Sequence, residues 1–222
     1  MLNTNTLDFL KDISANNNRE WFEKNKADYL IAQINVKSFM ADLEVELNKS
    51  DAIESWKLYR IYRDIRFSKD KTPYKNYFSG YFKRQGAARR GSYYISLQPG
   101  NTVIGGGFYG PSKEDLLRIR KEFQADSKTI NQIISNPRFV QNFGTLEGNG
   151  VATAPRNFDK DHPNIHFIRK KQFYAFRSFT DKEVLSKNFL AQALETCLVI
   201  RPFFDYMSDV LTTNLNGESI LK

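Results

Sequence analysis

Apolar residues recur at helical spacing over the first 47 residues of the chain. This spacing predicts a short helix over residues 6–13 and a long helix over residues 19–47. The run Asn16-Asn17-Asn18 separates the two helices and can cap the second. We expect the long helix to bend near residues 33–35.

The hydrophobic pattern then changes to strict alternation. Tyr, Ile and Phe alternate with Arg and Asp from Lys57 to Phe67, which predicts a strand over that segment. Further segments rich in Tyr, Phe, Val and Ile are separated by glycines, and they predict an antiparallel meander over residues 76–83, 92–98 and 102–109. The tightest hairpin is expected at Pro99-Gly100-Asn101.

Helices and strands are mixed in the rest of the chain. Ser112 can cap a helix that begins near Pro111, and Thr180-Asp181-Lys182-Glu183 is a capping box for a C-terminal helix that kinks or restarts at Pro202. Between them we expect a helix over residues 128–135 that stops before Pro137, and strands over residues 165–169 and 172–179.

This order of elements predicts an α+β fold. We expect a single domain over residues 1–222, in which a largely antiparallel sheet is packed by N-terminal, middle and C-terminal helices. The last few residues are expected to be disordered. Of the 222 residues, 41% are hydrophobic and 26% are charged, which is sufficient for a globular core.

Composition also bears on location. No apolar run approaches the ~18 residues that span a bilayer, and the first residues lack the basic and apolar regions of a leader. The one cysteine, Cys197, excludes an intramolecular disulfide and is expected to be a buried, inert thiol. We therefore expect a cytoplasmic protein with no membrane partner, and the sequence gives no indication of protein partners.

The positive charge is concentrated in one segment. The chain has a formal net charge of +8. The segment from Lys57 to Arg90 contains eleven basic and two acidic residues, so it carries a net charge of +9. Such a segment creates a local field that attracts an anion.

The predicted strand arranges part of this charge. Alternation along a strand places Arg60, Asp64 and Arg66 on one face, where the carboxylate can orient two guanidinium groups and leave donors for an anion. Arg63 falls on the apolar face and needs a carboxylate partner such as Glu20 or Glu23.

A loop follows the predicted strand. Asp70 suits an Asx turn, and the extended step at Thr72-Pro73 leads into the next strand. We interpret the whole segment as an anion pocket, with ligand-binding residues Arg60, Arg63, Asp64, Arg66, Lys69, Lys71, Tyr74 and Lys75. The alternative interpretation is an internal ion-pair network that braces a strand–loop–strand corner.

Other candidate sites are weaker. The run Gly105-Gly106-Gly107 lacks the sequence of a phosphate-binding loop and favours a glycine turn at a strand end. No familiar metal-ligand spacing is present among Asp159, Asp161, His162 and His166, so we expect no metal and no cofactor.

The leading functional hypothesis is a protein that binds a small phosphate- or carboxylate-bearing ligand. If it is an enzyme, Asp64 or Asp70 would act as acid or base, but nothing in the sequence indicates turnover. The alternative is a nucleic-acid-binding module, because aromatic residues such as Tyr77 and Tyr81 are interleaved with the basic ones. The same aromatic pattern is typical of a packed sheet, and a purely structural or interaction domain is the third option.

The basic segment also resembles a known family. Its run from Arg63 to Lys75 is similar to the signature of the bacterial and fungal family called domain of unknown function 2461. Asn18-Arg19-Glu20-Trp21-Phe22, the approach to a helix at residues 107–111, and Pro155-Arg156-Asn157-Phe158 before Asp161-His162-Pro163 agree with it, although a glycine is more usual where Asn157 stands. The resemblance extends from about Leu7 to Leu211 and implies no activity.

Overall fold

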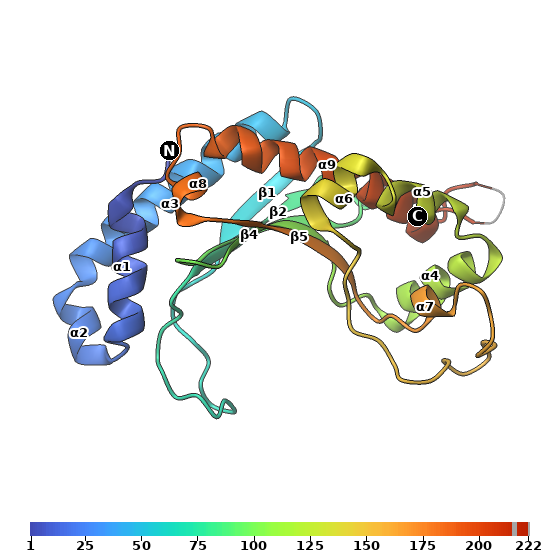
Figure 1. Cartoon of the computed structure of the whole chain (residues 1–222), viewed down its shortest axis with the longest axis horizontal. Coiled ribbons are helices and arrows are strands. Elements are labelled where there is room, and N and C mark those ends of the chain that lie inside the picture. The colour runs from blue at the N-terminus through green and yellow to red at the C-terminus, as the bar shows by residue number, and fades with distance from the viewer. Residues whose placement is uncertain (215–216, 222) are drawn as a thin grey trace. The chain divides into compact units, whose positions relative to one another are not determined.

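The computed structural model describes residues 1–214 and 217–221 (Figure 1). Contacts group the chain into two units, each assembled from three stretches. The first unit contains Met1–Phe82, Tyr94–Ile104 and Ser178–Glu195. The second contains Lys83–Tyr93, Gly105–Arg177 and the described part of Thr196–Lys222. The C-terminal disorder expected from the sequence falls in part on Lys222, which lies outside the described residues.

The described residues form a five-stranded antiparallel sheet whose strands follow one another in chain order. The bounds are β1 Ile53–Leu58, β2 Phe78–Arg84, β3 Ser92–Leu97, β4 Thr102–Phe108 and β5 Phe173–Phe179. β1 belongs to the first unit, and the other strands contribute residues to both units. The predicted meander and the α+β fold class are therefore confirmed.

Along the chain, helices lie before β1, between β4 and β5, and after β5. The first unit contains α1 Thr4–Ala15, α2 Arg19–Lys24, α3 Lys26–Leu47 and α8 Asp181–Val184. The second contains α4 Lys113–Ala125, α5 Lys128–Ile134, α6 Pro137–Phe143 and α7 Ile165–Ile168. α9, Phe189–Thr212, has residues in both units.

Several helices begin where capping residues predict. The side chain of Asn18 accepts a hydrogen bond from the Trp21 N–H, and the side chain of Ser112 accepts one from the Asp115 N–H. These side chains satisfy backbone donors that have no partner inside the helix. The capping box at Thr180 is also present, but it starts the four-residue helix α8 rather than the C-terminal helix.

The long helix expected over residues 19–47 is broken at Asn25. The backbone N–H and the side-chain amide of Asn25 both donate to the Trp21 carbonyl, so α2 ends there and α3 begins. The helix α3 then continues through the residues where we expected a bend. In α9, the helix likewise runs through Pro202 without a restart.

Two local patterns in the second half were misleading. The segment predicted as a strand over residues 165–169 instead contains the helix α7, Ile165–Ile168, and the adjacent residues Phe167 and Ile168 are both buried. A strand would direct these two side chains to opposite faces, whereas one helical turn can bury both. The helix predicted over residues 128–135 is present as α5 and ends before Pro137, but Pro137 then begins the unexpected helix α6, with Asn136 as its cap.

β1 ends at Leu58, so the strand predicted over Lys57–Phe67 is wrong. Residues 59–77 form a loop whose two arms are joined by an antiparallel bridge between Tyr62 and Tyr74 (teal in Figure 1). The alternation of apolar and charged residues in this segment thus belongs to a loop with a single bridge between its arms. Most backbone groups of the segment have no neighbouring strand with which to pair. The assignment of charged residues to one strand face fails with the strand.

Aromatic side chains fill the core of the first unit. Phe9 on α1 packs with Tyr29 on α3, with ring centres 5.8 Å apart, and α1 lies against α3. The Phe189 ring lies 5.1 Å from that of Phe39 and 5.3 Å from that of Phe179. Burying such large apolar side chains anchors the helices beside the loop.

The run Gly105-Gly106-Gly107 lies inside β4 and not in a strand-end turn. A methyl group at Gly105 would stand 2.0 Å from the Ala175 carbonyl oxygen, and one at Gly107 would stand 2.2 Å from the Phe173 carbonyl oxygen. The run is therefore explained by the close approach of the β5 backbone in the second unit.

We expect Gly105→Ala to lower the free energy of unfolding by about 1–3 kcal/mol, because the new methyl group collides with rigid backbone. Gly110→Ala is the matched control, since a methyl group there meets nothing within 4 Å. Urea denaturation monitored by circular dichroism measures both. Equal stability of the two variants would contradict the close approach of β4 and β5.

Candidate functional site

The loop of residues 59–77 is held together by the guanidinium group of Arg63. Its Nη1 donates to the Asp70 carboxylate and to the Thr72 hydroxyl. Asp70 in turn accepts hydrogen bonds from the Thr72 N–H at 2.9 Å and the Thr72 hydroxyl at 2.8 Å, so the expected Asx turn is confirmed. The partner of Arg63 is thus a carboxylate of its own loop rather than Glu20 or Glu23.

These contacts keep the Asp70 carboxyl ionised. The Thr72 N–H, followed by the Arg63 guanidinium and the Thr72 hydroxyl, lowers the pKa of Asp70 to about 2. Hydrogen bonds to the charged form favour that form. Asp70 therefore serves as a negative charge that positions Arg63.

A side chain from the α1–α2 connection fixes the second arm of the loop. The amide of Asn17 donates to the Tyr74 carbonyl at 3.0 Å and accepts from the Tyr74 N–H at 3.1 Å. The Tyr74 ring is only 4% exposed and stacks on Phe22, with ring centres 4.0 Å apart. This anchoring places the next residue, Lys75, beside the end of α1.

Asp64 holds a different arginine. Its carboxylate accepts from the Nε of Arg66 at 2.9 Å and from the Nη2 at 2.6 Å. These bonds, most of all the side-chain bond from Arg66, lower the pKa of Asp64. The Arg66 side chain is 76% exposed, so this pair lies at the surface of the loop.

Lys75 has neighbours of another kind. Its Nζ lies 5.5 Å from the centre of the Tyr59 ring and 5.8 Å from that of the Tyr77 ring, within the range of cation–π contacts. Burial lowers the pKa of the Lys75 ammonium, and the charge of Arg60 lowers it further. In the described part of the chain, this ammonium has no hydrogen bond and no ion pair.

These groups surround a cleft of about 550 Å³ in the first unit. The predicted residues that line it are Arg63, Asp64, Asp70, Tyr74 and Lys75. The others, Arg60, Arg66, Lys69 and Lys71, do not line it, and Lys71 donates instead to the Ile65 carbonyl at 3.0 Å.

Sequence reasoning missed half of the wall of the cleft. Ser14, Asn17, Thr72, Asn76 and Tyr77 also line it. The run of asparagines at residues 16–18 and the asparagine directly after Lys75 were visible signals of polar, hydrogen-bonding positions.

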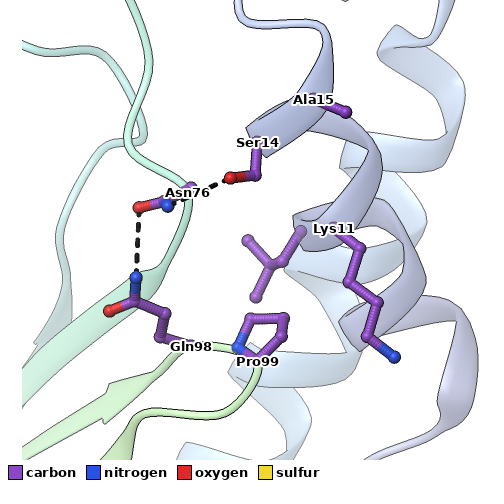
Figure 2. A pocket seen from close by; sticks show the side chains of 7 residues that line it. Lys11, Ser14, Ala15, Asn76, Gln98 and Pro99 are labelled. Atoms are coloured by element: carbon purple, nitrogen blue, oxygen red, sulfur yellow. Dashed lines mark hydrogen bonds between the residues drawn. The ribbon is translucent and has the colours of Figure 1, made fainter.

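A second pocket of about 380 Å³ shares Ser14 and Asn76 with the cleft. Figure 2 shows Asn76 donating to the Ser14 hydroxyl, at 3.3 Å, and accepting from the Gln98 amide, at 3.5 Å. Lys11 and Pro99 lie at its other side. The polar wall of the cleft therefore continues along α1 toward the β3–β4 turn.

Other candidate chemistry is accounted for by structure. Cys197 is buried, which raises the pKa of its thiol. Within residues 1–214 and 217–221, no group of three or more His, Cys, Asp or Glu side chains is arranged to hold a metal ion. Of the interleaved aromatic residues, Phe78, Phe82 and Tyr93 belong to the core.

Among the helices of the described residues, none combines the length and the apolar character needed to cross a membrane.

The described chain combines an α+β fold with a basic loop that is braced by ion pairs. The chain belongs to the family DUF2461, described as "Conserved hypothetical protein", and the match covers residues 5–206. The resemblance seen in the sequence is thereby confirmed. A comparison with curated proteins found no match, and a comparison with solved structures found none either.

We expect an NMR titration of the Asp70 carboxyl to have its midpoint at about 2. Since this pKa lies below the ordinary value of 3.8, the ionised carboxylate stabilises the loop above about pH 4. That contribution is lost as the pH falls through the folded pKa.

The variant Arg63→Met should raise this midpoint, yet leave it below 3.8 because the Thr72 N–H still donates. Lys69→Met is the control, because the Lys69 side chain lies in the same loop but has no hydrogen bond or ion pair with Asp70 in the described structure. A midpoint of 3.8 in the unsubstituted chain would show that the turn and the ion pair do not form in solution.

Proposed function

We propose that the cleft binds a small phosphate- or carboxylate-bearing ligand through Lys75 and Arg63, with the charge of Arg60 close by. The observation that carries this proposal is the Lys75 ammonium, a half-buried cation that lines a cleft and lacks a carboxylate partner in the described structure. An uncompensated charge of this kind is costly in the free protein. A bound anion would relieve that cost.

The pairing of the two carboxylates in the cleft supports the proposal. Asp70 is engaged by Arg63, and Asp64 is engaged by Arg66 from outside the cleft. Neither has a described bond to Lys75. Arg60 lies close enough to lower the pKa values of both Asp64 and Lys75, so it adds a second positive charge at this position.

Arg63 can contribute without breaking its ion pair. Both of its bonds to the loop leave from Nη1, and the described structure gives no partner to its Nε or Nη2. A guanidinium fork with one occupied and one open side suits a phosphate or carboxylate. Asp70 would thus orient the arginine while the anion takes the remaining donors.

Acid–base catalysis by the two aspartates does not form part of the proposal. Both carboxyl groups have lowered pKa values, so they remain ionised at neutral pH and are weak bases.

The proposal also places the protein in the cytoplasm, where small phosphorylated or carboxylated ligands would be encountered.

One observation favours nucleic-acid binding as a second candidate. Phe67, at the exposed end of the loop, is 96% exposed and lies beside Arg66, with Lys69 and Lys71 nearby in the sequence. An exposed ring among cations can stack on a base. A duplex bound through six phosphates would give a log–log salt slope of about −5, and a pocket for one anion would give a shallower slope.

We expect inorganic phosphate to raise the melting temperature of the protein, as measured by scanning calorimetry. Lys75→Met should weaken phosphate binding about tenfold or more, because a hydrogen bond to a charged group contributes roughly 1.5–3 kcal/mol.

Lys69→Met is the matched control: it removes one charge from the same loop but lies outside the cleft. It should leave phosphate binding nearly unchanged. If both variants weaken binding equally, the loop acts only through its net charge and the cleft is not a specific site. A steep salt slope with an oligonucleotide, without phosphate protection, would favour the nucleic-acid candidate.

A further inference from the structure

Lys75 has the surroundings of a lysine that reacts rather than one that only carries charge. It lines a cleft, it is partly buried, and a second cation, Arg60, is close by. Only the neutral amine has a lone pair with which to attack carbon. Burial and a neighbouring cation both favour that neutral form.

A carboxylate next to Lys75 would reverse this effect by stabilising the ammonium. The two carboxylates that line the cleft are instead bonded to arginines, Asp70 to Arg63 and Asp64 to Arg66. Neither carboxylate has a described bond to the Lys75 ammonium, so neither pairs with it directly. Lys71, by comparison, donates to the Ile65 carbonyl and lies outside the cleft.

We propose that Lys75 forms an imine with the carbonyl carbon of a small anionic aldehyde or ketone bound in the cleft. This inference rests on the proposed function, because the open side of Arg63 would hold the anionic group. Phosphorylated aldehydes and 2-oxo acids share the required chemistry, which is a carbonyl carbon a short distance from a negative charge.

The step is balanced without an oxidant or a reductant. The Lys75 Nζ lone pair forms a bond to the carbonyl carbon, and the π electrons of the C=O bond move to oxygen, which takes a proton. Loss of a proton from nitrogen and of water from carbon then forms the C=N bond. The overall change is amine plus carbonyl giving imine plus water, and the open cleft lets the water leave.

Reductive trapping tests the proposal on the full chain. The protein is incubated at neutral pH with glyoxylate, an anionic aldehyde, in the presence of cyanoborohydride, and peptide mass spectrometry locates the resulting secondary amines. We expect Lys75 to be labelled several-fold faster than Lys69 or Lys71, since a lowered pKa increases the fraction of free amine at neutral pH. Inorganic phosphate should slow labelling at Lys75 alone.

Matched variants separate reactivity from binding. Lys75→Arg keeps the positive charge of the cleft but has no reactive amine, so the phosphate-sensitive labelling should be lost. Arg60→Met should slow labelling at Lys75, because it removes the neighbouring positive charge that lowers the Lys75 pKa. Propanal, an uncharged aldehyde, should label Lys75 more slowly than glyoxylate does.

Each failure has a distinct meaning. If phosphate binds but Lys75 is labelled no faster than Lys69, the imine is wrong and the anion site stands. If propanal labels Lys75 as fast as glyoxylate does, the anionic substrate class is wrong. If phosphate neither binds nor slows labelling, the proposed function itself fails, whatever the rate at Lys75.

Discussion

The ion pair between Arg63 and Asp70 is the interaction on which the candidate site depends. Residues 59–77 form no helix or extended strand, so their backbone cannot be held by a regular ladder of hydrogen bonds. The guanidinium group of Arg63 links Asp70 and Thr72 to the opposite arm of the loop, and the Asn17 amide fixes Tyr74 from the α1–α2 connection. Together these contacts hold Lys75 in the wall of the cleft.

The same pairing explains how a structural network and a binding site can occupy one segment. The sequence presents them as alternatives, because arginines and aspartates in alternation suit either one. In the structure, each of the two aspartates is bonded to an arginine, and this leaves Lys75 without a described carboxylate partner. We infer that the network creates the site by engaging the negative charges that would otherwise neutralise it.

Features that depend on neighbouring residues could be predicted from the sequence, whereas features that depend on contacts between distant residues could not. The caps at Asn18 and Ser112 and the meander of β2–β4 follow from neighbouring residues, so the sequence predicts them. The alternation after Lys57 is the same for a sheet strand and for a two-armed loop. Only the segment that pairs with it distinguishes the two. The bonds from Asn17 to Tyr74 join residues 57 positions apart, so no local pattern could reveal them.

The central claim is that Lys75 is an uncompensated cation inside an anion-binding cleft. An NMR titration of the Lys75 side chain, with and without inorganic phosphate, tests it most directly. The account predicts a pKa below the ordinary value of 10.5 in the free protein, and a higher pKa when phosphate is bound, because the anion stabilises the ammonium. A pKa of 10.5 that phosphate does not change would contradict the account.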